Sequence, residues 1–181
     1  EQFNDLWILN EEYVHYTGCS ELPINQIVDE KGQPLLRPIS DEAIKERGIK
    51  PGLRPDIFLY PEEGKCVLVE LKALDVNLAD HISQMTKYCN LIASYSVRRI
   101  QKFYCYLIGE KFNPYADLDG NYVETVSGDW IGPNVPIRTM DQERAHIGTL
   151  QIEVSKLSSL YARAHRRNKS FADKLGLREL L

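Results

Sequence analysis

The sequence has no long apolar run: no stretch of the 181 residues approaches the roughly 20 apolar residues that a membrane-spanning helix needs. No signal-peptide pattern opens the chain either. We therefore expect no membrane partner.

An excess of positive charge is also lacking, because 22 Lys and Arg residues face 26 Asp and Glu residues, which leaves a formal net charge of −4. Such a chain has no overall positive field that attracts nucleic acid, although local basic clusters can still bind it. The four cysteines include no C-x-x-C pair, and Cys66, Cys89 and Cys105 lie inside apolar patterns. Free cysteine in such patterns behaves as a small apolar residue, so we expect a reducing, cytoplasmic compartment.

The length fits a single domain spanning residues 1–181. The chain opens at Glu1 and runs straight into a patterned segment, so we expect it to have been cut from a longer polypeptide. The spacing of apolar residues and the positions of turn residues predict a series of helices and strands. The predicted elements are a helix over 3–16, a short helix from Ser40 to Gly48, a β-hairpin over 54–73, a helix over 77–95, a strand over 100–109, short strands near 121–125 and 135–139, a strand over 148–154 and a helix over 155–177. This order indicates an α/β fold with a mixed central sheet flanked by helices.

Two of these helices have a predicted buried side. In the helix over 77–95, an apolar stripe is formed by Leu78, Ile82, Met85, Cys89 and Ile92. In the last helix, with Ser155 as its N-cap, the predicted buried residues are Leu157, Leu160, Tyr161 and Ala164.

Three charged residues stand out in the hairpin. Asp56 opens its first strand, and Glu70 and Lys72 lie near the end of the second. Side chains alternate along a strand, so Glu70 and Lys72 project from one face, and pairing of the strands brings Asp56 to the same end. Two carboxylates suit Mg²⁺ or Mn²⁺, and a lysine beside them suits a phosphate substrate. The alternative is a structural ion cluster in which the lysine neutralises two carboxylates.

These residues resemble a known group. Pro55-Asp56 followed by Glu70-Leu71-Lys72 is similar to the signature of the PD-(D/E)XK nuclease superfamily, and Gln84 with Tyr88 is similar to the Q-x-x-x-Y element of its RecB-like exonuclease branch. The resemblance implies a restriction-endonuclease-like core and hydrolysis of phosphodiester bonds that depends on a divalent metal.

Roles follow from that resemblance. Asp56, Glu70 and the carbonyl of Leu71 hold one or two Mg²⁺ ions, and Lys72 orients the attacking water. Gln84 and Tyr88 position that water or the phosphate backbone; the alternative is a hydrogen-bonded pair at the edge of the core.

The resemblance also implies a further acidic ligand from the first helix. Glu11 is the preferred candidate, followed by Glu12, and the alternative for both is a solvated helix face. Three arginines of the last helix, Arg163, Arg166 and Arg167, are candidates for contacts to nucleic-acid phosphates; the alternative is again a solvated face.

A second likeness concerns the two ends of the chain. "LWILNEEY" and "YARAHRRNKSFADKLGL" are similar to the C-terminal nuclease-like part of some bacterial proteins that begin with a GHKL-type ATPase. The resemblance implies an effector domain in a bacterial defence (antiviral) or repair protein, with an ATPase in the same polypeptide as a partner and a homo-oligomer as an option.

Two functions follow for comparison with the structure. The first is a Mg²⁺-dependent nuclease, with DNA as the expected substrate and RNA as the alternative. The second is a catalytically inactive module of the same fold that binds nucleic acid or assembles with another protein.

Overall fold

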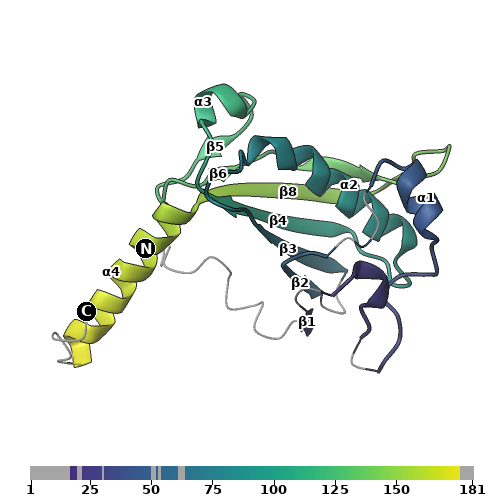
Figure 1. The fold of residues 1–181 in the computed structure, drawn as a ribbon, viewed down its shortest axis with the longest axis horizontal. Coiled ribbons are helices and arrows are strands. Elements are labelled where there is room, and N and C mark those ends of the chain that lie inside the picture. The colour runs from purple at the N-terminus through teal and green to yellow at the C-terminus, as the bar shows by residue number, and fades with distance from the viewer. Residues whose placement is uncertain are drawn as a thin grey trace.

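The structure is a computed structural model and describes residues 17–19, 22–29, 31–49, 52, 54–60 and 64–175. The predicted helix over 3–16, which includes Glu11 and Glu12, lies outside these residues. One mixed sheet forms the centre of the described part, with α2 on one face and α4 leaving its end (Figure 1).

The sheet has eight strands in the order β1-β2-β3-β4-β8-β6-β5, and β7 also pairs with β8. The pairs β3–β4 and β4–β8 are parallel and the other pairs are antiparallel, which confirms the expected α/β fold with a mixed sheet. The strands are β1 (Thr17–Cys19), β2 (Ile57–Tyr60), β3 (Lys65–Leu71), β4 (Lys102–Gly109), β5 (Val123–Glu124), β6 (Trp130–Ile131), β7 (Val135–Arg138) and β8 (His146–Lys156). The helices are η2 (Ile24–Gln26), α1 (Asp41–Glu46), α2 (Ala79–Tyr95), α3 (Pro114–Asp117) and α4 (Leu157–Leu175).

The predicted order of elements is confirmed from the short helix α1 onward. Ser40 caps α1 by accepting a hydrogen bond from the backbone nitrogen of Ala43 at 3.2 Å, and Gly48 follows the helix with a positive φ of 68°. The sequence patterns missed β1, η2, α3 and the two-residue strand β6. No helix in the described ranges is long and apolar enough to span a membrane.

β3 is the central strand that the alternating pattern predicts. Cys66 and Leu68 face the larger core cluster, whereas Val67 and Val69 face a smaller cluster on the opposite side of the sheet. All four side chains are buried. A strand that is covered on both faces and paired along both edges has little freedom to shift its register.

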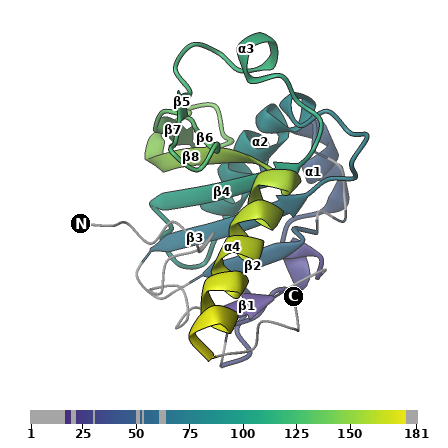
Figure 2. The same ribbon diagram turned by 90° about the vertical axis from the view of Figure 1, so that its left-hand side faces the viewer.

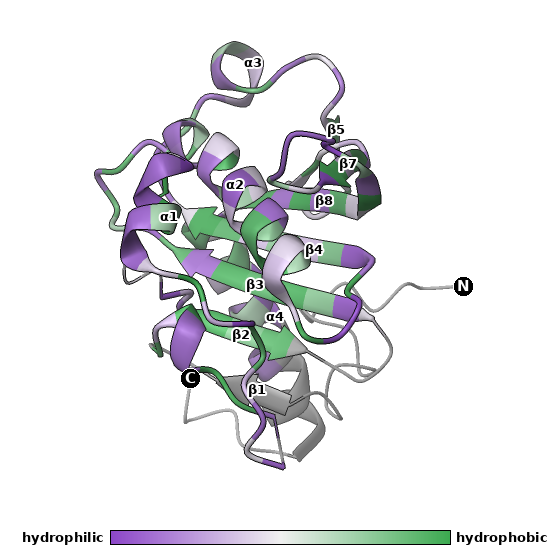
Figure 3. Ribbon diagram, turned by 90° about the vertical axis from the view of Figure 1, so that its right-hand side faces the viewer, coloured by the Kyte–Doolittle hydropathy of each residue, from purple (hydrophilic) through white to green (hydrophobic). Residues whose placement is uncertain are grey.

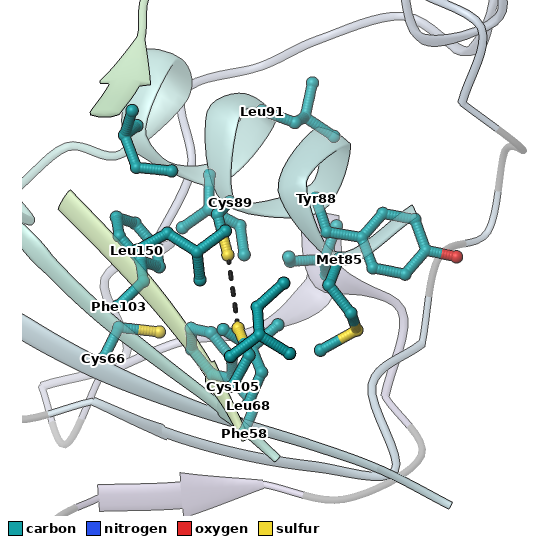
Figure 4. Packing of buried hydrophobic residues seen from close by; sticks show 14 of the residues in the cluster. Phe58, Cys66, Leu68, Met85, Tyr88, Cys89, Leu91, Phe103, Cys105 and Leu150 are labelled. Carbon is teal, nitrogen blue, oxygen red and sulfur yellow. Dashed lines mark hydrogen bonds between the residues drawn. The ribbon is translucent and has the colours of Figure 1, made fainter. Parts of the chain in front are cut away.

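Helix α2 covers one face of the sheet through the predicted stripe. Leu78, Met85, Cys89 and Ile92 are at most 1% exposed, and Ile82 packs against the same cluster. Tyr88 and Leu91 are buried as well. Figure 4 shows Cys89 and Met85 of α2 pointing toward residues of β3 and β4. Figure 3 shows the hydrophobic strands β3 and β4 beneath α2.

Helix α4 differs from its prediction in two ways. Ser155 does not directly precede the helix, because it lies within β8, which runs to Lys156 and continues straight into α4 at Leu157. The buried side chains include Leu160 and Arg163, whereas Leu157 and Tyr161 are 43% and 72% exposed. The helix crosses in front of the sheet in Figure 2.

A buried ion pair attaches α4 to the body of the protein. The Nη1 atom of Arg163 lies 2.7 Å from Oδ2 of Asp129, and Nη2 donates to Oδ1 at 3.1 Å. Both residues are at most 6% exposed. A bidentate pair of this kind is strong, but either charge becomes costly when its partner is removed.

A second carboxyl group adjoins this pair. The pKa of Glu153 is raised to about 7: burial is the largest cause and the negative charge of Asp129 adds to it, whereas Arg163 and a hydrogen bond with Ser155 act in the opposite direction. Glu153 lies on β8 opposite Ile131 of β6 and beside Tyr106 of β4. The cluster therefore contains two carboxyl groups and one guanidinium.

Replacing Asp129 by Ala leaves the Arg163 guanidinium buried without its bidentate partner. We expect the variant to lose about 3 kcal/mol of unfolding free energy, near the lower end for a broken buried pair because Glu153 lies nearby. Urea denaturation of Asp129→Ala, Arg163→Met and the double variant tests this. The double variant should be more stable than Asp129→Ala, because it leaves no buried charge without a partner. If the loss of unfolding free energy in the double variant equalled the sum of the losses in the two single variants, the pairing of Asp129 with Arg163 would be contradicted.

The raised pKa of Glu153 predicts a pH dependence of stability. The folded protein holds this proton more tightly than the unfolded chain, so Glu153 favours folding at low pH and this advantage is lost as the pH rises from about 4.5 to about 7. Glu153→Gln should therefore gain stability relative to the wild type between pH 5 and pH 8, by up to about 3 kcal/mol. Denaturation at both pH values measures it, with the exposed Glu143→Gln as a control that should show no such gain.

Candidate active site

The pairing of β2 with β3 places the first two carboxylates together. Ile57 pairs with Val69 and Phe58 with Leu68 in an antiparallel register. Continuing this register by one residue sets Asp56 opposite Glu70. Residues directly opposite each other on antiparallel strands project from the same face, so both carboxylates belong to the face that carries α2.

The carboxylate of Asp56 is fixed by the end of β3. Its Oδ2 atom accepts a hydrogen bond from the backbone nitrogen of Leu71 at 2.6 Å. The group is partly exposed, and its second oxygen has no partner among the hydrogen bonds of the described residues. Asp56 thus keeps acceptor capacity beside the backbone of Leu71.

Glu70 and Lys72 form an ion pair on the same face. The Nζ atom of Lys72 lies 2.5 Å from Oε1 of Glu70, and the side chains of Lys72 and Glu70 are 16% and 13% exposed. Lys72 is itself anchored, because its backbone nitrogen donates to the carbonyl of Ile108 at 2.8 Å. The amine and the carboxylate are therefore close and mostly shielded from water.

Helix α2 brings its polar side chains to this group. The amide of Gln84 hydrogen-bonds to the hydroxyl of Tyr88, and Oε1 of Gln84 lies 2.9 Å from Nδ1 of His81. Burial raises the pKa of Tyr88 to about 12, and the negative charge of Glu70 contributes to the rise. The charge of Glu70 thus acts on Tyr88, which is consistent with both side chains lying on the α2 side of the sheet.

A glycine that the sequence patterns did not single out allows this packing. A Cβ atom at Gly109 would lie 2.6 Å from Cδ2 of Leu78 and 3.3 Å from the Cβ of Lys72. The absence of a side chain at the end of β4 lets the start of α2 approach Lys72. Only the spatial neighbours reveal this requirement, because Gly109 otherwise reads as the end of a buried strand.

The donors fit a hard divalent cation in type. Asp56 and Glu70 offer carboxylate oxygens, and Leu71 offers a backbone carbonyl at the end of β3; Mg²⁺ prefers such oxygen ligands and keeps several waters. Within the described ranges, no three His, Cys, Asp or Glu side chains come together as a metal site. The expected acidic ligand Glu11 and its alternative Glu12 lie outside the described residues.

The three arginines that were predicted to contact phosphates lie in different environments. Arg163 is buried and bonded to Asp129, so the structure contradicts its assignment to a nucleic-acid surface. Arg166 is exposed on α4, and the side chain of Arg167 is not among those that the structure describes. Only Arg166 is therefore seen at the surface as such a contact requires.

No protein-family model matches the chain, and neither the curated proteins nor the solved structures compared with it include a match. The resemblance to the PD-(D/E)XK superfamily thus stays a prediction that is based on the residues quoted above.

Removing the charge of Glu70 should lower the pKa of Tyr88, because a neighbouring negative charge opposes formation of the phenolate. The value in Glu70→Gln should fall below about 12 but stay above the ordinary value of 10, since burial is the larger cause. NMR titration of ¹³C-labelled tyrosine measures this. The exposed Asp75→Asn variant is the control, and an unchanged pKa in Glu70→Gln would contradict the proximity of the two groups.

Proposed function

We propose that this chain is a Mg²⁺-dependent nuclease that hydrolyses the phosphodiester bonds of DNA. The observation that supports it best is the convergence of Asp56 and Glu70 on adjacent antiparallel strands, with the amine of Lys72 in contact with Glu70. Tyr88 adds a hydroxyl group from α2 on the same face.

Three oxygen donors would hold the metal: the carboxylates of Asp56 and Glu70 and the carbonyl of Leu71. The bound ion supplies two effects, a lowered pKa of a bound water and charge stabilisation at the phosphate. The hydrogen bond from the Leu71 nitrogen orients the Asp56 carboxylate toward the end of β3, where that carbonyl also lies.

Lys72 and Tyr88 supply donors for the substrate. The Lys72 amine, held by Glu70, places a positive charge where negative charge develops on the phosphate. With a pKa near 12, the Tyr88 hydroxyl keeps its proton at neutral pH and can donate a hydrogen bond to a phosphate oxygen or a water. The bond from Gln84 fixes the orientation of this hydroxyl.

The likeness at the two ends of the chain extends the proposal to the whole protein. We place the nuclease as an effector of a larger bacterial defence or repair protein with an ATPase in the same polypeptide. The second candidate is a catalytically inactive module, which the Glu70–Lys72 ion pair favours because it neutralises both charges without a metal. The net charge of −4 favours it as well.

Cleavage assays separate these two functions. Plasmid, linear duplex, single-stranded DNA and RNA are incubated with the protein in Mg²⁺, Mn²⁺ or EDTA. We expect cleavage of DNA with either metal and none in EDTA. Asp56→Ala and Lys72→Met should each reduce the rate at least about a hundredfold, because each removes a group that acts on the metal or the developing charge.

The exposed Asp75→Asn variant, which changes an acid just after β3, is the matched control and should cleave at the wild-type rate. Cleavage that persists in EDTA, or in Asp56→Ala, would contradict the proposed site. Saturable DNA binding without cleavage at any protein concentration would favour the inactive module.

A further inference from the structure

A pocket of about 340 Å³ lies between α1, α2 and the segment that follows β7. Its lining residues are Arg37, Pro38, Arg47, Ser94, Tyr95, Thr139, Met140 and Asp141. We call it the Arg37–Arg47 pocket. The volume is within the range of small-molecule sites.

This pocket is separate from the candidate active site. Ser94 and Tyr95 lie at the C-terminal end of α2, whereas Gln84 lies near its beginning. Ten residues of helix separate Gln84 from Ser94, about 15 Å along the axis. In Figure 1, α1 lies near one end of α2, and the carboxyl end of β8, which leads into α4, lies at the other end of the sheet.

Two guanidinium groups provide the charge of the pocket. Nη2 of Arg37 donates to the carbonyl of Ser94 at 2.6 Å, and Nη1 of Arg47 donates to the carbonyl of Ala43 at 2.6 Å. Neither arginine forms an ion pair with a carboxylate of the described residues. Each guanidinium has five N–H donors, so most of them have no acceptor among the residues that the structure describes.

Arg47 is held in place with an unused donor. Its guanidinium carbon lies 5.6 Å from the centre of the Tyr95 ring, in a cation–π contact. Its Nε atom is buried and has no hydrogen-bond partner. Because this atom is shut off from solvent, a ligand in the pocket would have to bind to the terminal Nη groups of Arg47 instead.

The other polar groups of the pocket are already bonded. Oδ1 of Asp141, the single acid of the lining, accepts from the Thr139 hydroxyl at 2.6 Å and from two backbone nitrogens of its own loop. The Ser94 hydroxyl donates to the carbonyl of Asn90 and accepts from the Met140 nitrogen. None of these bonds uses Oδ2 of Asp141, so the capacity that is left is that of the two guanidinium groups and one carboxylate oxygen.

From this arrangement we infer that the Arg37–Arg47 pocket binds a phosphate monoester with a small apolar or aromatic group. Asp141 lowers the net charge of the lining to about +1, so the preference for phosphate rests on geometry: two guanidinium forks can donate to several phosphate oxygens at once, whereas a carboxylate offers only two oxygens. The volume equals about ten waters at roughly 30 Å³ each, so a phosphate alone leaves space. Pro38, Tyr95 and Met140 provide apolar surface for the rest of the ligand.

Isothermal titration in EDTA with phenyl phosphate, inorganic phosphate and benzoate tests the inference on the whole chain. Phenyl phosphate should bind saturably and more tightly than either of the other two. Arg37→Met and Arg47→Met should each weaken it at least about tenfold, since each removes a charged donor. Arg138→Met, the same change at an exposed arginine outside the lining, should leave the affinity within about twofold.

Lys72→Met should bind phenyl phosphate as the wild type does, which distinguishes this pocket from the candidate active site. Melting temperatures establish that the variants fold, and Arg37→Met serves as the test if Arg47→Met unfolds. Three results would each overturn the inference: no saturable binding of phenyl phosphate, tighter binding of benzoate, or equal losses in Arg37→Met and Arg138→Met.

Discussion

The arrangement of the candidate active site depends on one constraint, the register of β3. This strand is paired antiparallel to β2 and parallel to β4, and its centre is buried on both faces. A shift by one residue would move Cys66 and Leu68 out of the core that α2 covers and would turn Glu70 and Lys72 to the opposite face. The burial of the four apolar side chains at the centre of β3 thus determines the face on which Glu70 and Lys72 lie at its carboxyl end.

The same sheet supports two groups of charges in different ways. Glu70 and Lys72 lie at the end of β3, partly shielded but reachable, so a ligand can compete for their ion pair. Asp129 and Arg163 are buried and bonded through two pairs of atoms, with Glu153 beside them. The first group is suited to chemistry and the second to attachment of α4, although both combine carboxylates with a cation.

The sequence predicted the elements whose patterns are local. The alternation in β3, the stripe of α2 and the cap of α1 each depend on neighbours a few residues away, and all three are confirmed. Arg163 was misassigned because its partner Asp129 lies 34 residues earlier in a segment rich in turns. The exposure of Tyr161 and the role of Gly109 were missed for the same reason: both depend on how distant elements pack. The convergence of Asp56 with Glu70 could be predicted because a hairpin is itself local.

Three cysteines lie in the buried layer between α2 and the sheet, where their reactivity depends on whether this layer is closed. Cys66, Cys89 and Cys105 are at most 1% exposed, and the sulfur atoms of Cys89 and Cys105 are 3.5 Å apart (Figure 4). Burial raises the pKa of the Cys89 thiol, so it stays protonated and unreactive while the helix is in place. The alkylation rate of these thiols therefore reports how often α2, the helix that carries Gln84 and Tyr88, separates from the strands.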